Sequence, residues 1–359
     1  MMKDLKKVYE LLEDEQSKDI FLNRILYNLT RDDIYIDNMF QYELEHLRNS
    51  VYIKEIAKKL ENLIDNRDVI IYGIGDYGKL LSKFIEYFLP HIKILSFCDR
   101  KAKNVSTFLG YPVIDKNTYY LDYKECVLLV SPRYCSEEIV NELLEMHISI
   151  ENILSSSRNK EILECQLAYI CNQYFDDVIR LKENEVFVDG GCFDCSTSLI
   201  FRNKCQTYKK IIAFEPDSYN YKKCQSIKTE CNIENMDIYN YGMWNSETVL
   251  LFQLKGSLGS CISENGNDSI KVIDLDSIMQ GENVTFIKMD IEGAELNALK
   301  GAKETIQKWK PKLAICIYHK IEDIIEIPLY IHELVPEYKL YIRHYAWDHN
   351  ETVLYAVID

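Results

Sequence analysis

The sequence of 359 residues contains no long apolar run. Its longest apolar stretches, such as 313–318, are far shorter than the about 20 residues that a membrane-spanning helix needs. The first residues, MMKDLKKVYELLEDE, are acidic and lack the continuous apolar region of a secretory signal. We therefore expect no membrane span and a cytoplasmic location.

The sequence also lacks an excess of basic residues, because 42 Lys and Arg stand against 57 Asp and Glu, a net charge of −15. A strongly acidic chain is repelled by phosphate backbones, so we expect no nucleic-acid partner. Apolar residues make up 47% and charged residues 28% of the chain, a composition typical of globular proteins with a sizeable core. The length predicts two to three domains.

Twelve cysteines are present, but they are scattered through the chain and many lie in apolar strands, as Cys98, Cys126 and Cys316 do. In a reducing compartment such cysteines are mostly small buried apolar residues, so we expect no disulfide framework. The pair Cys192-x-x-Cys195 could form a redox couple or half of a zinc site. No second Cys-x-x-Cys completes a zinc site, so we assign no metal.

The apolar pattern divides the chain into a helical segment followed by two regions in which strands alternate with helices. Helical spacing of Ile53, Ile56, Leu60 and Ile64 predicts helices before the first strand. The alternation after Asp68 predicts parallel sheets. We expect an α/β fold with three parts: a helical segment over 1–65, a smaller Rossmann-like domain over 66–155 and a larger α/β domain over 156–359. The last two strands, over 338–343 and 352–357, are expected to be antiparallel.

A glycine-rich turn, Gly73-Ile74-Gly75-Asp76-Tyr77-Gly78, follows the first strand and opens a helix. Asp99 ends the next strand, in the position of an acid that bonds ribose hydroxyls. Gly73, Gly75 and Gly78 would let a phosphate approach the helix N-terminus. We expect a nucleotide or a nucleotide-sugar here; a packing role for the glycines is the alternative.

Carboxylates follow three strands of the second α/β region, as Asp189, Glu215 and Asp290. Ligands of open parallel sheets bind at the carboxyl ends of the strands. S-adenosyl-L-methionine suits such acids, because its ribose diol can bond Glu215 and its ammonium and sulfonium are cationic. Its carboxylate can meet backbone N–H groups at the helix start after Gly191. The alternative is that these acids only cap helices.

From about Gln173 to Val357 the chain resembles the FkbM family of S-adenosylmethionine-dependent methyltransferases. The resemblance is carried by five strings: FVDGGCFD, FEPD, IKMDIEGAELNALKGA, YHKIEDIIEIPLYI and ETVLYA. It implies a class I methyltransferase (Rossmann-like) domain that transfers methyl groups, most often to oxygen, with an acceptor in a polysaccharide or glycan pathway. The resemblance implies cofactor contacts at the following positions: Asp189, Gly191, Cys192, Glu215, Asp290 and, near the adenine, Asn240 and Gly242. One departure is Cys195, where close relatives have glycine.

Two residues are candidates for the base that takes a proton from the acceptor hydroxyl. His319 follows the strand over 313–318 and has a suitable unperturbed pKa, and Glu292 lies two residues beyond Asp290. Alternatively, Asp290 and Glu292 could bind a divalent cation. Arg343 and His344 could orient a small-molecule or glycan acceptor, or they could form structural salt bridges.

Two other functions remain open from the sequence. One is an NAD-dependent oxidoreductase or epimerase that acts on a nucleotide-sugar at Gly73–Gly78, although no residue stands out for hydride transfer. The other is a non-catalytic cofactor-binding scaffold in which Cys195 has silenced transfer. The sequence leaves the acceptor and the oligomeric state open.

Overall fold

The computed structural model describes residues 2–168, 173–253, 261–262 and 268–358. The chain forms two compact units: Met1–Phe40 together with Asn172–Asp359, called here the carboxyl-terminal unit, and Gln41–Cys171, the middle unit. The divisions expected at 65/66 and 155/156 both fall inside the middle unit. No helix within the described ranges is long and apolar enough to cross a membrane.

The middle unit is built on a six-stranded sheet in the order β3-β4-β2-β1-β5-β6. All neighbours are parallel except β3 and β4. Its strands are β1 (Val69–Tyr72), β2 (Ile94–Cys98), β3 (Thr107–Phe108), β4 (Tyr111–Ile114), β5 (Val127–Val130) and β6 (Ile153–Ser155). Every residue of β1 and β5 is buried, as expected for central parallel strands covered on both faces.

Helices connect these strands, so the predicted alternation is confirmed. Those between strands are α5 (Asp76–Phe88), α6 (Lys116–Asp122), α7 (Ser136–Glu145) and the 3₁₀ turns η1 (Arg100–Lys103) and η2 (Ile150–Asn152), whereas α4 (Val51–Ile64) precedes β1 and α8 (Lys160–Leu167) follows β6. The predicted apolar stripe before the first strand lies on α4, where Ile53, Ile56, Leu60 and Ile64 are all buried.

The carboxyl-terminal unit contains a seven-stranded sheet in the order β16-β17-β15-β14-β7-β8-β9. Its strands are β7 (Val186–Gly190), β8 (Lys210–Phe214), β9 (Met236–Tyr239), β14 (Phe286–Met289), β15 (Lys312–Cys316), β16 (Lys339–His344) and β17 (Thr352–Val357). The first five are mutually parallel, and β17 runs antiparallel between β15 and β16. The predicted α/β class and the antiparallel final pair are confirmed.

The order of the strands reverses direction at β7. The chain moves outward from β7 to β8 and β9, and then returns to add β14 and β15 on the other side of β7. Such a switch point leaves an opening at the carboxyl ends of the two strands that flank it, where open sheets bind their ligands. The turns that follow β7, β8 and β14 therefore lie at this opening.

Helices and a small second sheet complete this unit. The helices are α9 (Ser196–Lys204), α10 (Ser218–Glu230), α11 (Leu275–Met279), α12 (Glu295–Lys300), α13 (Lys303–Trp309) and α14 (Asp323–Leu334). The second sheet has the order β10-β13-β11-β12, from β10 (Gly242–Met243), β11 (Thr248–Gln253), β12 (Cys261–Ile262) and β13 (Asp268–Ile273).

The helix predicted over 294–308 is divided into α12 and α13 at Gly301. A Cβ on Gly301 would lie 2.0 Å from the carbonyl oxygen of Trp244, so the backbones approach too closely for any side chain. This contact joins segments more than fifty residues apart, which explains why the local helical pattern did not reveal the break.

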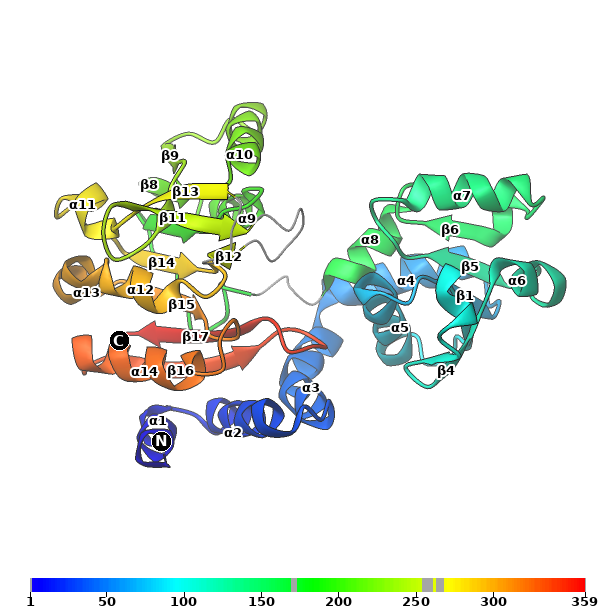
Figure 1. Cartoon of the computed structure of the whole chain (residues 1–359), viewed down its shortest axis with the longest axis horizontal. Coiled ribbons are helices and arrows are strands. Elements are labelled where there is room, and N and C mark those ends of the chain that lie inside the picture. Colours follow the sequence, from blue (N-terminus) through cyan, green and yellow to red (C-terminus); the bar gives the residue numbers. More distant parts are fainter. Residues whose placement is uncertain (1, 169–172, 254–260, 263–267, 359) are drawn as a thin grey trace. The chain divides into compact units, whose positions relative to one another are not determined.

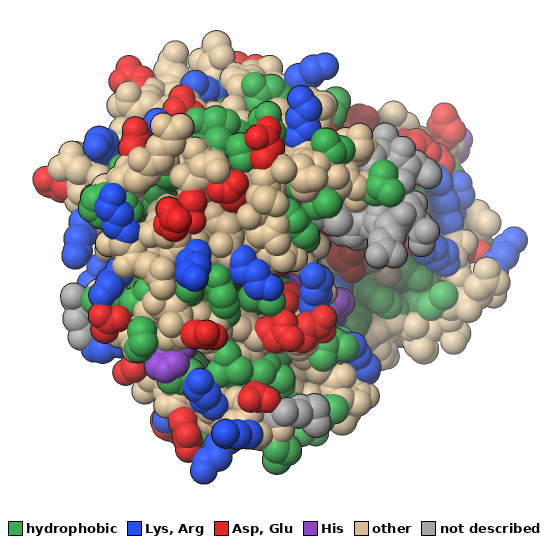
Figure 2. Space-filling model, turned by 60° about the vertical axis from the view of Figure 1, so that its left-hand side comes forward, with side chains coloured by type: hydrophobic (Ala, Val, Ile, Leu, Met, Phe, Trp, Pro, Cys, Tyr) green, Lys and Arg blue, Asp and Glu red, His purple; other side chains and the backbone are tan. Residues whose placement is uncertain are grey.

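The first helices of the chain belong to the carboxyl-terminal unit and pack on its edge strand. These helices are α1 (Met2–Leu11), α2 (Glu15–Thr30) and the beginning of α3 (Ile34–Asn49). In Figure 1, α2 runs beside β16, in agreement with the contacts between them and with a bridge between Leu12 and Leu340. On the face drawn in Figure 2, Lys and Arg side chains are interspersed with Asp and Glu.

Candidate functional site

The turn after β7 is held tightly between its two neighbouring strands. Gly191 has a φ of +75°, and a Cβ there would lie 2.0 Å from the carbonyl oxygen of Asp290, after β14. The amides of Gly191 and Cys192 both donate to the carbonyl oxygen of Phe214, at the end of β8. Only glycine fits this turn, and its contacts fix the spacing of the three strand ends.

Asp189, the last acid of β7, is completely buried and paired with Lys288 of β14. Lys288 Nζ lies 3.1 Å from Asp189 Oδ1 and also donates to the carbonyl oxygens of Gly190 and Gly191. The other Asp189 oxygen accepts from Ser198 Oγ of α9 at 2.6 Å. Burial by itself lowers the pKa of Lys288, but the carboxylates of Asp189 and Asp290 outweigh burial and raise it. Lys288 thus remains charged and fastens the turn to β14.

Glu215 follows β8 and lies against the same turn. Its Oε2 accepts from the amide of Phe193 at 3.0 Å, and its Oε1 accepts from the amide of Asp217 at 2.9 Å. The residue is only 5% exposed, and this burial raises the pKa of Glu215 to about 7 despite the two amide donors. Each carboxylate oxygen retains a lone pair that can accept a further donor.

Asn240 and Gly242 lie beside Glu215, at the end of β9 and in β10. The Asn240 amide group donates to the carbonyl oxygens of Glu215 and Pro216, at 2.9 and 3.1 Å. Gly242 is buried, and a Cβ there would lie 3.1 Å from Val272 and 3.6 Å from the Cβ of Pro216, which follows Glu215. Both predicted residues are therefore near the end of β8.

Asp290 comes directly after β14 and receives two phenol donors. Tyr174 donates to its Oδ2 at 2.8 Å and Tyr318 donates to its Oδ1 at 3.1 Å. Burial acts to raise the pKa of Asp290, but the nearby charges of Lys288 and His319 prevail and lower it. Asp290 is therefore ionised at neutral pH and keeps negative charge at this edge of the sheet.

His319 follows β15 and is surrounded by three carboxylates. Its Nδ1 lies 2.9 Å from Glu295 Oε1, and its Nε2 lies 3.4 Å from Asp290 Oδ1 and 3.7 Å from Glu292 Oε2. These are ion-pair distances, since no aligned hydrogen bond to the ring is present among the described residues. Burial lowers the pKa of His319, but the Glu295, Asp290 and Glu292 carboxylates together raise it to about 9.

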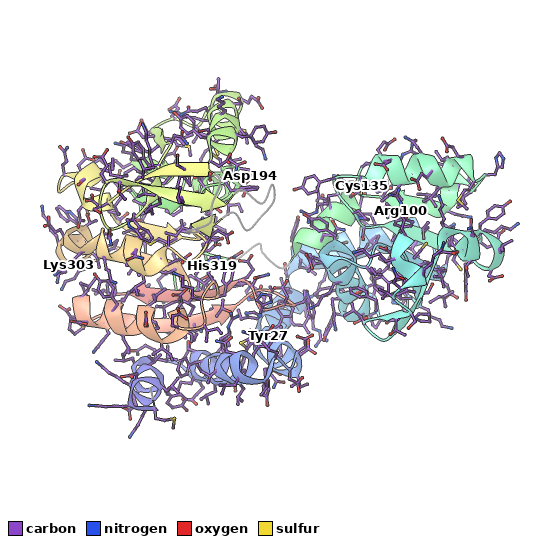
Figure 3. The ribbon with its side chains drawn as sticks, viewed as in Figure 1. Tyr27, Arg100, Cys135, Asp194, Lys303 and His319 are labelled. Atoms are coloured by element: carbon purple, nitrogen blue, oxygen red, sulfur yellow. The ribbon has the colours of Figure 1, made fainter. Side chains whose placement is uncertain are left out.

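Glu292 is the more accessible of the two predicted bases, with 36% of its side chain exposed against 9% for His319. Its backbone is left-handed, with a φ of +56°. Figure 3 shows His319 and Asp194 at the same end of the strands of this unit, whereas Lys303 lies at the opposite end.

Donor atoms of Asp290, Glu295 and His319 lie within 4.8 Å of one another, which is close enough for a shared metal ion. A metal must displace the proton of a histidine ligand, and the raised pKa of His319 opposes that loss. The cluster is therefore better described as an imidazolium held among carboxylates.

Three predicted residues are turned away from the strand ends. The Cys192 side chain is buried with Sγ 3.7 Å from Cys224 Sγ of α10. Arg343 pairs with Asp14 at 2.7 Å, and His344 lies 2.9 Å from Thr352 in the interior. For Arg343 and His344, the alternative of structural pairing fits these contacts better than an acceptor site.

The glycine turn predicted for a nucleotide lies in the middle unit. Gly73 (φ +108°) and Gly78 pack against each other, since a Cβ on Gly78 would lie 2.0 Å from the Gly73 carbonyl oxygen. Asp99 accepts from the amides of Ile74 and Lys101 at 3.1 and 2.8 Å. Gly75 stands at the N-cap of α5, where a Cβ would meet nothing within 4 Å.

Sequence reasoning missed Lys288, Glu295, Tyr174 and Tyr318, which complete the charge and hydrogen-bond network. One of them left a signal, because Lys288 interrupts an otherwise apolar buried strand, Phe286–Met289. Such a cation is expected to have a buried partner. The two tyrosines left none, since their contacts join distant segments.

Residues 186–343 match the family model described as the methyltransferase FkbM domain. No match was found among curated proteins. Among solved structures, methyltransferase FkbM from Methylobacillus flagellatus KT aligns at 19% identity over 91% of this chain and 100% of that chain, with a TM-score of 0.49.

Two further solved structures align with about half of the chain. An rRNA methylase from Streptococcus thermophilus aligns at 16% identity over 50% of this chain and 90% of that chain, with a TM-score of 0.34. Aeropyrum pernix fibrillarin, in complex with natively bound S-adenosyl-L-methionine, aligns at 9% identity over 54% of this chain and 74% of that chain, with a TM-score of 0.35.

Proposed function

We propose that the carboxyl-terminal unit is an S-adenosyl-L-methionine-dependent methyltransferase. The observation that carries this proposal is the gathering of Glu215, Asp290 and the Gly191 turn at the switch point of the sheet, inside the region that matches the methyltransferase FkbM domain. Open sheets bind their ligands at such a point.

The residues at this edge fit the chemistry of the donor. Glu215 presents a carboxylate with lone pairs left for a ribose diol, next to the turn that would carry the methionine end. Asp290 adds negative charge, which suits an ammonium and a sulfonium. The first turn of α9 presents N–H groups that suit the donor carboxylate.

S-adenosyl-L-methionine supplies an electrophilic methyl group when it is bound. The chain's own residues then have to hold an acceptor oxygen in line with that group and take its proton. We propose His319 as the base in its neutral form. Glu295 orients the ring through Nδ1, so that Nε2 faces Asp290 and Glu292.

We propose that the acceptor is the hydroxyl of a sugar or of a glycan-pathway intermediate. A hydroxyl is a poor nucleophile that needs a base, and His319 and Glu292 are placed to supply one. The interior positions of Arg343 and His344 favour structural roles for these residues over acceptor binding.

Isothermal titration of the intact protein with S-adenosyl-L-methionine tests the donor. We expect one equivalent to bind, with affinity reduced at least about tenfold in Glu215→Ala because the ribose acceptor is lost. Asp237→Ala, which removes a half-exposed acid of β9 paired with Lys210, is the matched control and should bind normally. Folded protein that gives no heat at millimolar donor contradicts the proposal.

Transfer of a tritiated methyl group to a panel of sugars, nucleotide-sugars and glycans tests the acceptor. Label on a sugar oxygen supports the proposal. Donor binding without transfer to any hydroxyl compound would favour the scaffold alternative.

We propose as a second function that the middle unit binds a nucleotide or nucleotide-sugar at the Gly73 turn. The favouring observation is the open space at Gly75, whose lack of a side chain leaves the N-terminal amides of α5 available for a phosphate. Titration with UDP-sugars, with Gly75→Asp as the variant, tests it: binding that is lost in the variant supports the proposal, and no binding contradicts it.

A further inference from the structure

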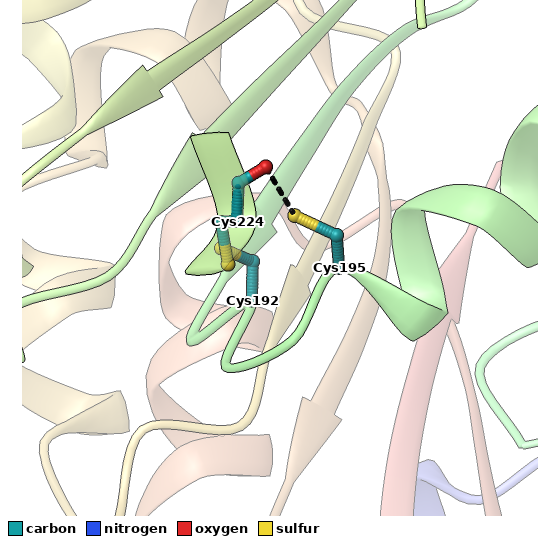
Figure 4. Close-up of side chains that lie close together, drawn as sticks. All are labelled: Cys192, Cys195 and Cys224. Carbon is teal, nitrogen blue, oxygen red and sulfur yellow. Dashed lines mark hydrogen bonds between the residues drawn. The ribbon is translucent and has the colours of Figure 1, made fainter. Parts of the chain in front are cut away.

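Three cysteines from separate segments of the carboxyl-terminal unit meet in its interior. Cys192 lies in the turn after β7, Cys195 is the N-cap of α9, and Cys224 lies in the middle of α10. Their sulfur atoms all lie within 4.8 Å of one another, and all three residues are buried (Figure 4). The sequence suggested only half of a zinc site, because Cys224 does not belong to a Cys-x-x-Cys pair.

The spacing of the sulfurs fits a shared metal ion. Two sulfurs bound tetrahedrally to zinc, each at about 2.3 Å, lie about 3.8 Å apart. Cys192 Sγ and Cys224 Sγ are 3.7 Å apart. Two sulfurs joined in a disulfide would be only about 2 Å apart. A disulfide would also join only two of the three cysteines, whereas a single metal ion can be bound by all three sulfurs.

The backbone at Cys195 gives an independent reason to expect a use for its side chain. Cys195 adopts a left-handed conformation, with a φ of +59°. This conformation costs a residue with a Cβ about 1 to 2 kcal/mol, and glycine avoids the cost. The strained cysteine is nevertheless present, and its side chain lies in the sulfur cluster rather than at the surface.

The surroundings offer these sulfurs few other partners. Cys224 Sγ lies 3.2 Å from the carbonyl oxygen of Phe193, and Cys195 Sγ lies 4.0 Å from the carbonyl oxygen of Cys224. All three cysteines belong to the apolar core that includes Phe201. A thiophilic cation would convert three weakly bonded thiols into ligands and would neutralise most of the thiolate charge in this interior.

We propose that Cys192, Cys195 and Cys224 bind a Zn²⁺ ion as thiolates. The protein supplies three ligands and leaves the fourth position to water or a small thiol. Binding releases the thiol protons, so the affinity rises with pH. The ion would fasten the turn after β7 to α10, and it would brace Phe193, whose amide donates to Glu215.

Cobalt and zinc titrations of the intact, reduced and metal-free protein test this site. We expect one equivalent of Co²⁺ to give a thiolate-to-cobalt charge-transfer band in the near ultraviolet and Zn²⁺ to abolish it. Cys195→Gly should weaken metal binding by about 100-fold or more, since it removes one of three ligands. This variant also relieves the backbone strain, so it is expected to fold.

Cys205→Ala is the matched control, because Cys205 is buried in the same apolar core and its Sγ donates to the carbonyl oxygen of Lys182. It should bind cobalt like the unmodified chain. Circular dichroism of each variant establishes that it is folded.

Two results would overturn the proposal. One is a folded, reduced protein that shows no charge-transfer band with Co²⁺, whether or not the same protein forms a Cys192–Cys224 disulfide when it is treated with glutathione disulfide. The other is that Cys195→Gly and Cys224→Ala bind Co²⁺ with the same affinity as the unmodified chain and give a charge-transfer band of the same intensity. Neither result depends on methyl transfer, so the metal site and the proposed activity stand or fall separately.

Discussion

The charge on His319 determines what this residue can do at the edge of the sheet. Three carboxylates raise its pKa to about 9, so at neutral pH most molecules carry an imidazolium. An imidazolium cannot accept a proton, and only the neutral fraction can act as the base. As long as the pH is below the pKa, the neutral fraction grows about tenfold for each unit by which the pH rises.

The first prediction concerns the pH dependence of methyl transfer. If His319 is the base, the rate at saturating substrates should rise from pH 7 and level off near pH 9. A glutamate base ionises well below neutrality and would give a flat profile over this range. Initial rates in the unmodified protein and in His319→Gln decide between them; a flat profile in the former would transfer the role to Glu292.

The second prediction concerns stability. Because the folded pKa of His319 is above its unfolded value of 6.5, the stabilisation is fully present below about pH 6.5 and is lost as pH rises through about 9. His319→Gln should therefore lower the free energy of unfolding by about 2 to 3 kcal/mol at pH 6 and by much less at pH 9.5.

Urea denaturation at the two pH values measures this difference. A double-mutant cycle with Glu295→Gln should show coupling at pH 6 that is much weaker at pH 9.5, since the imidazole of the ion pair at 2.9 Å is then mostly neutral. A loss of stability that is equal at both pH values would contradict the assigned charge.

Single residues were predictable where a strand end identified them. Glu215 and Asp290 follow apolar strands that are plain in the sequence, and both lie at the carboxyl ends of the two strands that flank β7. Glu295 and Tyr174 were not predictable, because their role depends on which distant segments meet. Asp189 shows a further limit of prediction from sequence. It lies at the end of β7 as expected, but its burial against Lys288 depends on the pairing of β7 with β14.

The turn after β7 is the element on which the site depends. It is held by the Phe214 carbonyl oxygen on one side and by the Asp290 backbone on the other. Its glycines allow a backbone approach that no other residue permits. A change in this turn should therefore displace Glu215 and Asp290 together.

The third prediction tests this close approach. Gly191→Ala should destabilise the protein by about 3 kcal/mol or more, since its Cβ would lie 2.0 Å from a backbone oxygen in a positive-φ conformation. Gly281→Ala is the matched control: its φ is +83°, but the nearest atom is the flexible end of Lys308 at 3.3 Å. The control should lose only about 1 kcal/mol.

Thermal denaturation and donor titration of both variants measure the effects. The close approach is contradicted if Gly191→Ala is no less stable than the control and still binds donor normally.

Most strands were predictable, since buried parallel strands form short apolar runs between turns. The division of α12 from α13 at Gly301 was not predictable, because it results from the approach of Trp244 rather than from the local pattern. The third cysteine of the sulfur cluster was missed for a similar reason, since α10 brings Cys224 back to the turn after β7.

At the scale of the whole molecule, the first forty residues and the last half of the chain form one unit. Asp14 is one of the residues that join them. It accepts from the Ser17 amide at the start of α2 and pairs with the buried Arg343 of β16 at 2.7 Å. The sequence assigned this segment to a helical part of its own, because a contact over more than three hundred residues leaves no local pattern.

The fourth prediction tests this connection. Asp14→Ala should lower the free energy of unfolding by about 2 to 4 kcal/mol, since it removes a helix cap and the carboxylate that pairs with Arg343 at 2.7 Å, whereas Asp176 lies 3.9 Å away. Asp274→Ala is the matched control, because Asp274 caps α11 by accepting from the Ser277 amide and has no ion pair with any residue that the structure describes. It should cost about 1 kcal/mol. Equal losses in chemical denaturation would show that the ion pair adds nothing.

The central claim is that acids at the ends of β8 and β14 receive a cationic methyl donor beside the Gly191 turn. A crystal of the intact protein soaked with S-adenosyl-L-methionine tests it most directly. The account predicts donor density at this edge, with both ribose hydroxyls on the Glu215 carboxylate and the sulfonium on the side of Asp290. Density found only at the Gly73 turn, or an edge filled by the chain's own side chains, would contradict it.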